Sequence, residues 1–300
     1  MIIEDLIDLH THGISGYDTQ TDKPETILKI AELHGKAGTG AILPTIYSGP
    51  IDLMRKNMEA VRKAMGLQSS RSKAQGCFNG QITAHFKLNA SRILGVHLEG
   101  PFLNPSRCGA LDKKSFLKPS MSSLSKLITG YEDVIGIITI APEIPGALKI
   151  IETCSGKGIK VNMGHSDATY KQALDGKKAG ASGVTHIFNA MRPFHHRDPG
   201  LACLGLLDED LYIEVIADGI HLHPETLEII FRIKRLDRII LVSDSVKGPK
   251  TVKGALFNNK GALRGSSITL SDSVEVLKKI GIPDAGIAEA AKDNPARYIS

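Results

Sequence analysis

The sequence predicts a (β/α)8 barrel, in which eight parallel strands alternate with helices in one domain over residues 1–300. Eight short runs rich in Ile, Val and Leu are separated by segments with an apolar residue at every third or fourth position. Runs as apolar as these are typical of parallel strands buried on both faces. No glycine-rich phosphate turn follows the first run, although the alternative, an open doubly wound sheet, would require one.

The eight expected strands follow the apolar, β-branched runs. In chain order they are Leu6–Ile14, Thr39–Tyr47, Arg92–Phe102, Val134–Pro142, Ile159–Ser166, Gly183–Asn189, Leu211–Asp218 and Ile239–Ser243. Strands that alternate with helices form a parallel sheet with right-handed crossovers. We therefore expect the carboxyl ends of all eight strands to meet at one rim of the barrel.

Helical spacing fills most of the intervals between these strands. The expected helices are Pro24–Lys36, Ile51–Met65, Leu124–Tyr131, Gly146–Gly156, Thr169–Ala179 and Pro224–Lys234. Two of them begin with proline followed by an acidic residue, a pattern typical of a first helical turn.

The pattern changes after the eighth strand. Thr251–Leu270 is rich in Gly, Asn and Ser, and Asn258-Asn259 lies between two short β-like stretches, which predicts a loop carrying a hairpin. Ser273–Ile280 and Ala285–Ala296 then predict helices that close the domain. The chain contains no internal repeat and no convincing linker, so one domain accounts for all of it.

Composition excludes several classes of protein. With 42% hydrophobic and 23% charged residues, the 300-residue chain resembles a soluble globular protein. Its excess of 37 Lys and Arg over 32 Asp and Glu is small and scattered, so we expect no nucleic-acid partner. No run of 18 apolar residues is present, so we expect no membrane span. Four separated cysteines and an acidic amino terminus without a signal peptide favour a cytoplasmic location.

Polar residues gather where the predicted strands end. In chain order these residues are His10, His12, Glu99, His165, His186, Asp218, His221, His223 and Asp244. In a (β/α)8 barrel, residues at the carboxyl ends of the strands form the active site. Imidazoles and carboxylates that converge on one rim predict a divalent-metal hydrolytic site. His97 lies two residues deeper than Glu99, so we expect it to pack in the barrel rather than to bind the metal.

These residue types predict metal-assisted hydrolysis without naming a substrate. Neutral imidazoles and a carboxylate would hold one or two zinc-like ions, which lower the pKa of a bound water from about 15.7 towards 7. Asp244 would take the proton of that water and deliver it to a leaving amine, since amide cleavage needs a base and then an acid.

Six motifs carry a resemblance to a known family. They are Asp8–Gly13 (DLHTHG), His97–Phe102 (HLEGPF), Gly164–Ser166 (GHS), Thr185–Met191 (THIFNAM), Asp218–His221 and Ser243-Asp244. Each resembles a motif of the amidohydrolase superfamily of metal-dependent hydrolases. In combination they are similar to the N-acetylglucosamine-6-phosphate deacetylase family, from about residue 6 to Arg297.

The resemblance implies an activity, a metal and an assembly. That family hydrolyses N-acetylglucosamine 6-phosphate to glucosamine 6-phosphate and acetate with a bound divalent metal, usually as a homodimer. It implies that Glu99, His165 and His186 hold the principal ion, expected to be Zn²⁺, with Fe²⁺ or another divalent metal as alternatives. His10 and His12 match the pair that binds a second ion, and Asp244 matches the general acid/base.

The resemblance also implies a set of substrate contacts. The amides of Asn189 and Ala190 would meet the phosphate, and Arg197 would reach the phosphate of the substrate in a neighbouring subunit. The guanidinium fork suits phosphate geometry. Further matching positions are Ala110, Leu111, His221, Leu263, Arg264 and Gly265.

Three departures leave the substrate open. The family's small β-sandwich, built from both chain ends, is expected to be absent, because His10 lies very early and the chain stops at Ser300. Leu111 stands where the family has a histidine that touches the sugar and the amide, and leucine cannot donate a hydrogen bond. Residues 245–248 also differ from the usual run of small residues.

Two alternatives therefore accompany the deacetylase interpretation. The first is an amidohydrolase acting on another acylated amino sugar, such as N-acetylgalactosamine 6-phosphate. The second is a non-catalytic barrel that binds a sugar phosphate, although a pure binder needs no base beside a metal. A nucleic-acid phosphodiesterase is disfavoured, because HLEGPF and THIFNAM are not its pattern.

Overall fold

Eight parallel strands form a barrel in the computed structural model, which describes residues 3–74, 90–248, 254–257 and 263–300. Their order around the sheet is β1 (Leu6–Thr11), β4 (Thr39–Tyr47), β6 (Val96–Glu99), β7 (Ile135–Ile140), β8 (Lys160–Met163), β9 (Gly183–Val184), β10 (Tyr212–Ile216) and β11 (Ile239–Val242). The barrel closes between its first and last strands, where the amide of Asp244 donates to His10 O and the amide of His12 donates to Ser245 O. The predicted (β/α)8 barrel is confirmed.

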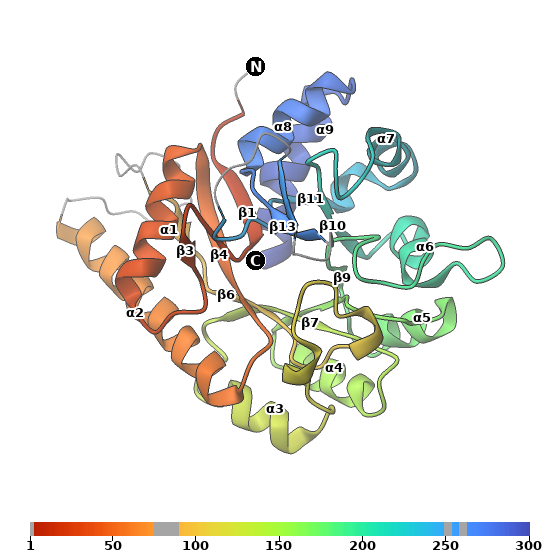
Figure 1. The fold of residues 1–300 in the computed structure, drawn as a ribbon, viewed down its shortest axis with the longest axis horizontal. Coiled ribbons are helices and arrows are strands. Elements are labelled where there is room, and N and C mark those ends of the chain that lie inside the picture. Colours follow the sequence, from red (N-terminus) through yellow and green to blue (C-terminus); the bar gives the residue numbers. More distant parts are fainter. Residues whose placement is uncertain (1–2, 75–89, 249–253, 258–262) are drawn as a thin grey trace.

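Helices surround the strands, as Figure 1 shows. In chain order they are α1 (Pro24–Lys36), α2 (Ile51–Ala74), α3 (Met121–Ile128), α4 (Ala147–Gly156), α5 (Tyr170–Lys178), α6 (Gly200–Leu207), α7 (Pro224–Ile233), α8 (Leu270–Lys279), α9 (Asp284–Ala288) and α10 (Asn294–Ile299). Helix α2 is longer than predicted. Helix α6 was not predicted, because its run GLACLGLL is apolar on nearly every face and shows no amphipathic period.

Seven of the eight predicted strands are shorter than expected, all but Thr39–Tyr47, and three of them also change path. The run Arg92–Phe102 is two segments, β5 (Arg92–Ile93), which pairs with β4, and β6. Gly95 separates them with φ of 140°, where a Cβ atom would meet Val134 O at 2.4 Å. The run Gly183–Asn189 forms a strand only over β9, and Leu6–Ile14 leaves the barrel after β1 to form a hairpin of β2 (Gly13–Ile14) and β3 (Tyr17–Asp18).

The chain after β11 forms a hairpin and closing helices, as predicted. Strands β12 (Ala255–Phe257) and β13 (Leu263–Ser266) pair antiparallel, whereas Asn258-Asn259, predicted to lie between them, fall outside the described residues. The second closing helix consists of α9, a π-helical turn η4 (Glu289–Asp293) and α10 rather than one continuous helix. Short 3₁₀ turns η1 (Pro105–Arg107), η2 (Lys113–Ser115) and η3 (Leu236–Arg238) complete the described elements.

The apolar core has two parts. The larger lies between the strands and the surrounding helices, and the smaller fills the barrel interior with Leu9, Leu43, Ile137 and Val242 among its members. Tyr298 of α10 belongs to the interior cluster, so the last helix packs against the barrel interior. The polar residues that β6, β8 and β10 direct into the barrel, His97, Glu99, Asn162 and Glu214, are buried as well. In the described part of the chain, no helix is long and apolar enough to cross a membrane.

Candidate active site

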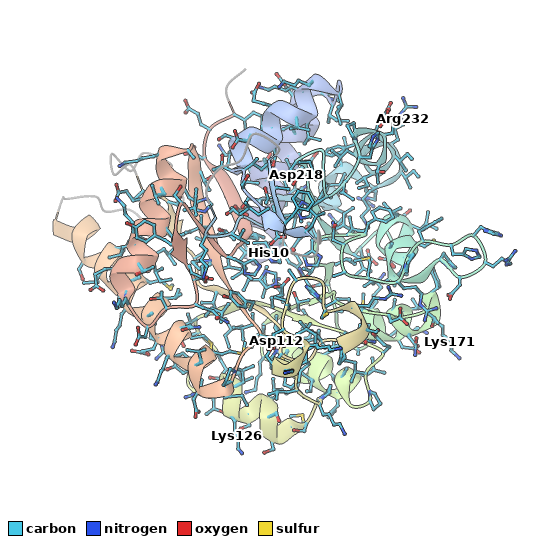
Figure 2. All side chains as sticks on the ribbon, in the orientation of Figure 1. His10, Asp112, Lys126, Lys171, Asp218 and Arg232 are labelled. Carbon is cyan, nitrogen blue, oxygen red and sulfur yellow. The ribbon has the colours of Figure 1, made fainter. Side chains whose placement is uncertain are left out.

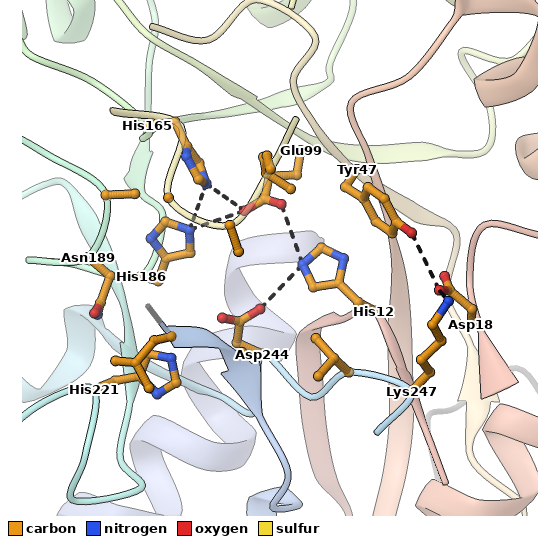
Figure 3. A pocket seen from close by; sticks show the side chains of 17 residues that line it. His12, Asp18, Tyr47, Glu99, His165, His186, Asn189, His221, Asp244 and Lys247 are labelled. Atoms are coloured by element: carbon orange, nitrogen blue, oxygen red, sulfur yellow. Dashed lines mark hydrogen bonds and ion pairs between the residues drawn. The ribbon is translucent and has the colours of Figure 1, made fainter. Parts of the chain in front are cut away.

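A pocket opens at the carboxyl ends of the strands, and Figure 3 shows its side chains. In Figure 2, His10 lies near the middle of the ring of strands, whereas Lys126, Lys171 and Arg232 lie at the periphery. The residues that line the pocket are His12, Asp18, Tyr47, Glu99, Gly109, Ala110, Leu111, His165, His186, Asn189, Ala190, His221, Asp244, Val246, Lys247, Leu263 and Gly265.

Glu99, His165 and His186 meet at the centre of this pocket. The Oε1 atom of Glu99 lies 3.0 Å from His165 Nε2 and 3.1 Å from His186 Nε2, and the two imidazole nitrogens are 3.2 Å apart. Ligands bound about 2.0–2.1 Å from a tetrahedral zinc ion lie about 3.3 Å from one another. The three atoms therefore have the mutual spacing of ligands that share one ion.

The local backbone aims these imidazoles at Glu99. His165 and His186 have φ values of 46° and 28°, which interrupt the strands and turn both rings inward. His165 Nδ1 lies 2.9 Å from Arg107 O and therefore carries the hydrogen, which leaves the lone pair of Nε2 facing the cluster. The ring is thus presented as a metal ligand would be.

His10 and His12 form a second group that shares Glu99. His12 Nε2 lies 3.4 Å from Glu99 Oε2 and 3.3 Å from Asp244 Oδ1. His10 Nε2 lies 3.3 Å from His12 Nε2 and 3.6 Å from Asp244 Oδ1. His10, His12 and Glu99 thus present three ligand atoms close enough for one further ion.

The charges of the site favour a cation. Burial opposes ionisation of Asp244, but the hydrogen bond with His12 and the nearby imidazoles outweigh it and lower its pKa to about 2. Burial likewise opposes a proton on His12, yet Glu99 and Asp244 raise its pKa to about 9. In the described part of the chain, no Lys or Arg pairs with either carboxylate. The two carboxylates therefore favour a bound cation, and a divalent ion would supply the positive charge.

The residues present fit a divalent metal in chemistry as well as in spacing. Imidazole and carboxylate ligands suit zinc and other first-row metals. Ligating imidazoles must be neutral: burial already lowers the pKa of His10 to about 3, whereas His12, whose pKa is raised, would give up its proton when the ion binds. The chain therefore contains groups of His and Glu side chains that could hold a divalent metal, and the assignment of metal to them belongs to the proposal below.

Asp244 lies beside both groups at the end of β11. Its φ of 47° turns the carboxylate into the pocket, and its side chain keeps 13% of its surface exposed. The carboxylate is thus in contact with His12 and reachable from the pocket. This is the position that a proton-transferring group needs.

The expected substrate contacts divide into those that line the pocket and those that do not. Ala110, Leu111, Asn189, Ala190, His221, Leu263 and Gly265 line it. His221 is oriented by Asp218, whose Oδ2 accepts from His221 Nδ1 at 2.6 Å. The side chain of Arg264 lies outside what the structure describes, and that of Arg197 is exposed and does not line the pocket of its own chain. His223 is also exposed and pairs with Glu225 instead.

Sequence reasoning missed a polar group at one end of the pocket. Lys247 Nζ lies 3.0 Å from Asp18 Oδ2, and Tyr47 Oη lies 3.4 Å from the same oxygen. Figure 3 shows these three beyond His12, on the side away from Asn189 and His221. Tyr47 could have been found as the last residue of a predicted strand, whereas Asp18 is delivered by the unpredicted β2–β3 hairpin.

Two buried acids below the pocket were also missed. Asp8 accepts from the amides of His10 and Ser243, and Glu214 lies in the middle of β10. Burial raises the pKa of each to about 7. His97, expected to pack in the barrel, is buried there, with Nδ1 3.1 Å from Leu9 O and Nε2 2.8 Å from Thr139 Oγ1.

Comparison with known proteins places this geometry in a family. Residues 6–273 match the Amidohydrolase family. An N-acetylgalactosamine-6-phosphate deacetylase of Escherichia coli O157:H7 is 29% identical over 98% of this chain and 76% of its own length. An N-acetylglucosamine-6-phosphate deacetylase of Lysinibacillus sphaericus is 32% identical over 93% of this chain and 71% of its own. The structure of N-acetylglucosamine-6-phosphate deacetylase from Thermotoga maritima superimposes with a TM-score of 0.84 at 26% identity, covering 99% of this chain and 78% of that one.

Proposed function

The chain belongs to the amidohydrolase family, and from that premise we propose that it is a metal-dependent deacetylase of amino-sugar 6-phosphates. The reaction is hydrolysis of the N-acetyl amide of N-acetylglucosamine 6-phosphate to glucosamine 6-phosphate and acetate. One observation carries the proposal. Glu99, His165 and His186 lie in the pocket at the spacing of metal ligands, and Asp244 lies beside them. Relatives of the chain at 29–32% identity are deacetylases of hexosamine 6-phosphates.

The donor set suggests which residues hold metal. Glu99, His165 and His186 would hold the principal ion, and His10 and His12 would hold a second one together with Glu99. Zinc is the ion we propose, because three imidazole or carboxylate ligands with an open position are typical of catalytic zinc. When bound, the metal polarises the amide carbonyl and lowers the pKa of the attacking water.

Asp244 moves the proton. Its low pKa keeps the carboxylate ionised near neutral pH, so it can accept the proton released when water attacks the amide carbon. The carboxylate lies beside the second ligand group, with Oδ1 3.3 Å from His12 Nε2. Asp244 then donates the proton to the amide nitrogen, which leaves as the free amine while acetate is released.

The substrate would lie across the pocket with its phosphate away from Asp18. We propose that the phosphate meets the amides of Asn189 and Ala190, which line the opposite side. Arg197 is exposed outside the pocket of its own chain, so a phosphate contact requires a second copy. We therefore propose a homodimer in which Arg197 completes the site of the partner.

A second candidate substrate is N-acetylgalactosamine 6-phosphate. Leu111 lines the pocket at the position where the family has a histidine, so a hydrogen-bond donor to the sugar is missing there. One of the relatives that cover nearly the whole chain is a deacetylase of that epimer. The two epimers differ at one hydroxyl, so the residues that face the sugar would decide between them.

Release of free amine from each epimer by zinc-loaded protein tests the proposal. We expect turnover of at least one of the two 6-phosphates and little turnover of unphosphorylated N-acetylglucosamine, since the phosphate contacts would be lost. Binding of both 6-phosphates without release of amine would instead identify a sugar-phosphate-binding barrel and refute the deacetylase assignment.

A further inference from the structure

A buried carboxylate beneath the pocket contacts His10. Glu214 lies in β10 with 1% of its surface exposed, and its Oε2 atom is 2.9 Å from His10 Nδ1. Glu214 also accepts from the amide of His186 at Oε2 and from Asn162 Nδ2 at Oε1, so it acts as an acceptor on both oxygens and, when ionised, leaves the hydrogen on Nδ1 of His10. The lone pair of His10 then lies on Nε2, the atom that faces His12 Nε2 at 3.3 Å. Glu214 thereby fixes which nitrogen of His10 can bind a metal.

The second oxygen of Glu214 continues a chain of hydrogen bonds through the barrel. Its Oε1 atom accepts from Asn162 Nδ2 at 2.8 Å, and Asn162 Oδ1 accepts from Tyr298 Oη at 2.5 Å. With its hydrogen used there, Tyr298 accepts from Ser182 Oγ at 2.9 Å. The chain joins His10 to helix α10, which packs against the barrel interior.

The amide of Asn162 makes this chain directional. Its Nδ2 group donates and its Oδ1 atom accepts, so Asn162 fits between a carboxylate and a hydroxyl donor only in one orientation. Glu214, Asn162 and Tyr298 are all buried, and a reversed orientation would place Asn162 Oδ1 against Glu214 Oε1, with two acceptors facing one another. Hydrogen bonds at both oxygens therefore fix the orientation of the Glu214 side chain relative to His10.

Glu214 supports a ligand rather than acting as one. His10, His97 and Glu214 are close enough to hold an ion themselves. Both nitrogens of His97 are occupied, however, by Leu9 O and by Thr139 Oγ1. Both oxygens of Glu214 are also hydrogen-bonded. The group of His10, His97 and Glu214 therefore does not offer three ligand atoms to an ion.

We propose that Glu214 is a positioning residue that sets the tautomer and orientation of His10 for a second metal ion, and that Tyr298 positions Glu214 through Asn162. The inference rests on the proposed two-ion site. An outer carboxylate of this kind raises the basicity of the ligating imidazole, and loss of such a partner typically weakens metal binding about 10- to 100-fold.

Zinc affinity, measured by competition with a chromophoric chelator, tests the proposal without reference to activity. Glu214→Gln keeps the shape of the side chain but presents one acceptor oxygen in place of the two that face His10, Asn162 and the His186 amide. Tyr298→Phe removes only the far end of the chain and serves if Glu214→Gln does not fold. Lys234→Met is the control, because its buried ammonium contacts the carbonyls of Gly205 and Asp208 rather than the metal ligands.

We expect the wild-type chain to bind two zinc ions. Glu214→Gln should weaken the weaker site about 10- to 100-fold and leave the stronger site within about threefold. Tyr298→Phe should weaken the same site by less, and Lys234→Met should change neither. A wild-type chain that binds one ion, a Glu214→Gln change that spares the second site, or an equal loss at both sites would overturn the proposal. If these shifts occur but no amide is hydrolysed, the proposed function fails and the positioning role stands.

Discussion

Replacing Asp244 by asparagine removes the proposed proton carrier with little change of shape. Asparagine tolerates the φ of 47° at this position as well as aspartate does, so the backbone should keep its path. The amide can still contact His12 Nε2, which lies 3.3 Å from Oδ1. It cannot accept a proton from water or return one to the amine, so the change isolates proton transfer.

The size of the effect follows from that role. A positioned acid or base contributes about 10²- to 10⁴-fold, equivalent to about 3–5 kcal/mol of transition-state stabilisation. Asp244→Asn should therefore lower kcat by about that factor. KM should change little, because the carboxylate is placed to act on the reacting water and amine rather than on the phosphate.

The assay is release of free amine from saturating N-acetylglucosamine 6-phosphate, with bound zinc measured in the same samples. Asp237→Asn is the matched control, because it makes the same change just before β11 rather than just after it, where Asp237 pairs with Arg235 and Arg238. It should leave kcat unchanged. If fully metal-loaded Asp244→Asn turned over at the wild-type rate, Asp244 would not carry the proton and the mechanism would be wrong.

Three further predictions address the pocket and the fold. Burial lowers the pKa of His34 from 6.5 to about 4. Between pH 6.5 and about pH 4, His34 is therefore protonated in the unfolded chain but neutral in the folded chain. The free energy of unfolding should fall by up to about 3 kcal/mol as pH falls through that range, and urea unfolding of His34→Leu should show a smaller slope. Leu111→His should raise kcat/KM for N-acetylglucosamine 6-phosphate about 2- to 10-fold by restoring one hydrogen bond, and an unchanged value would show that the sugar does not reach position 111. Arg197→Ala should raise KM for the 6-phosphate about tenfold. The control Arg232→Ala, at an exposed position paired with Glu228, should leave KM unchanged. If the two variants had the same KM, Arg197 would not contact the phosphate.

The barrel and the convergence of the candidate ligands could be predicted because they follow from local patterns. Parallel strands place their carboxyl ends at one rim, so Glu99 and Asp244 were expected to meet although 145 positions separate them. The motifs around His165 and His186 added the other two candidate ligands. Neither step required knowledge of a side-chain contact.

The residues that were missed depend on contacts that no local pattern encodes. Glu214 lies inside a strand, where an acid gives no sign of which ligand it supports until β1 and β10 are placed in one barrel. Lys247 and Asp18 meet only because the β2–β3 hairpin folds back to the loop after β11, where the Gly16 amide donates to Lys247 O. Helix α6 escaped detection because it is buried on most of its faces and therefore has no polar stripe.

Titration of metal-free protein with zinc, followed by acetate release from N-acetylglucosamine 6-phosphate and its galactosamine epimer, tests the central claim most directly. We expect no release without metal and a rate that rises in step with bound zinc, reaching a plateau at one or two ions per chain. Zinc that binds at that stoichiometry while neither 6-phosphate releases acetate would contradict the account.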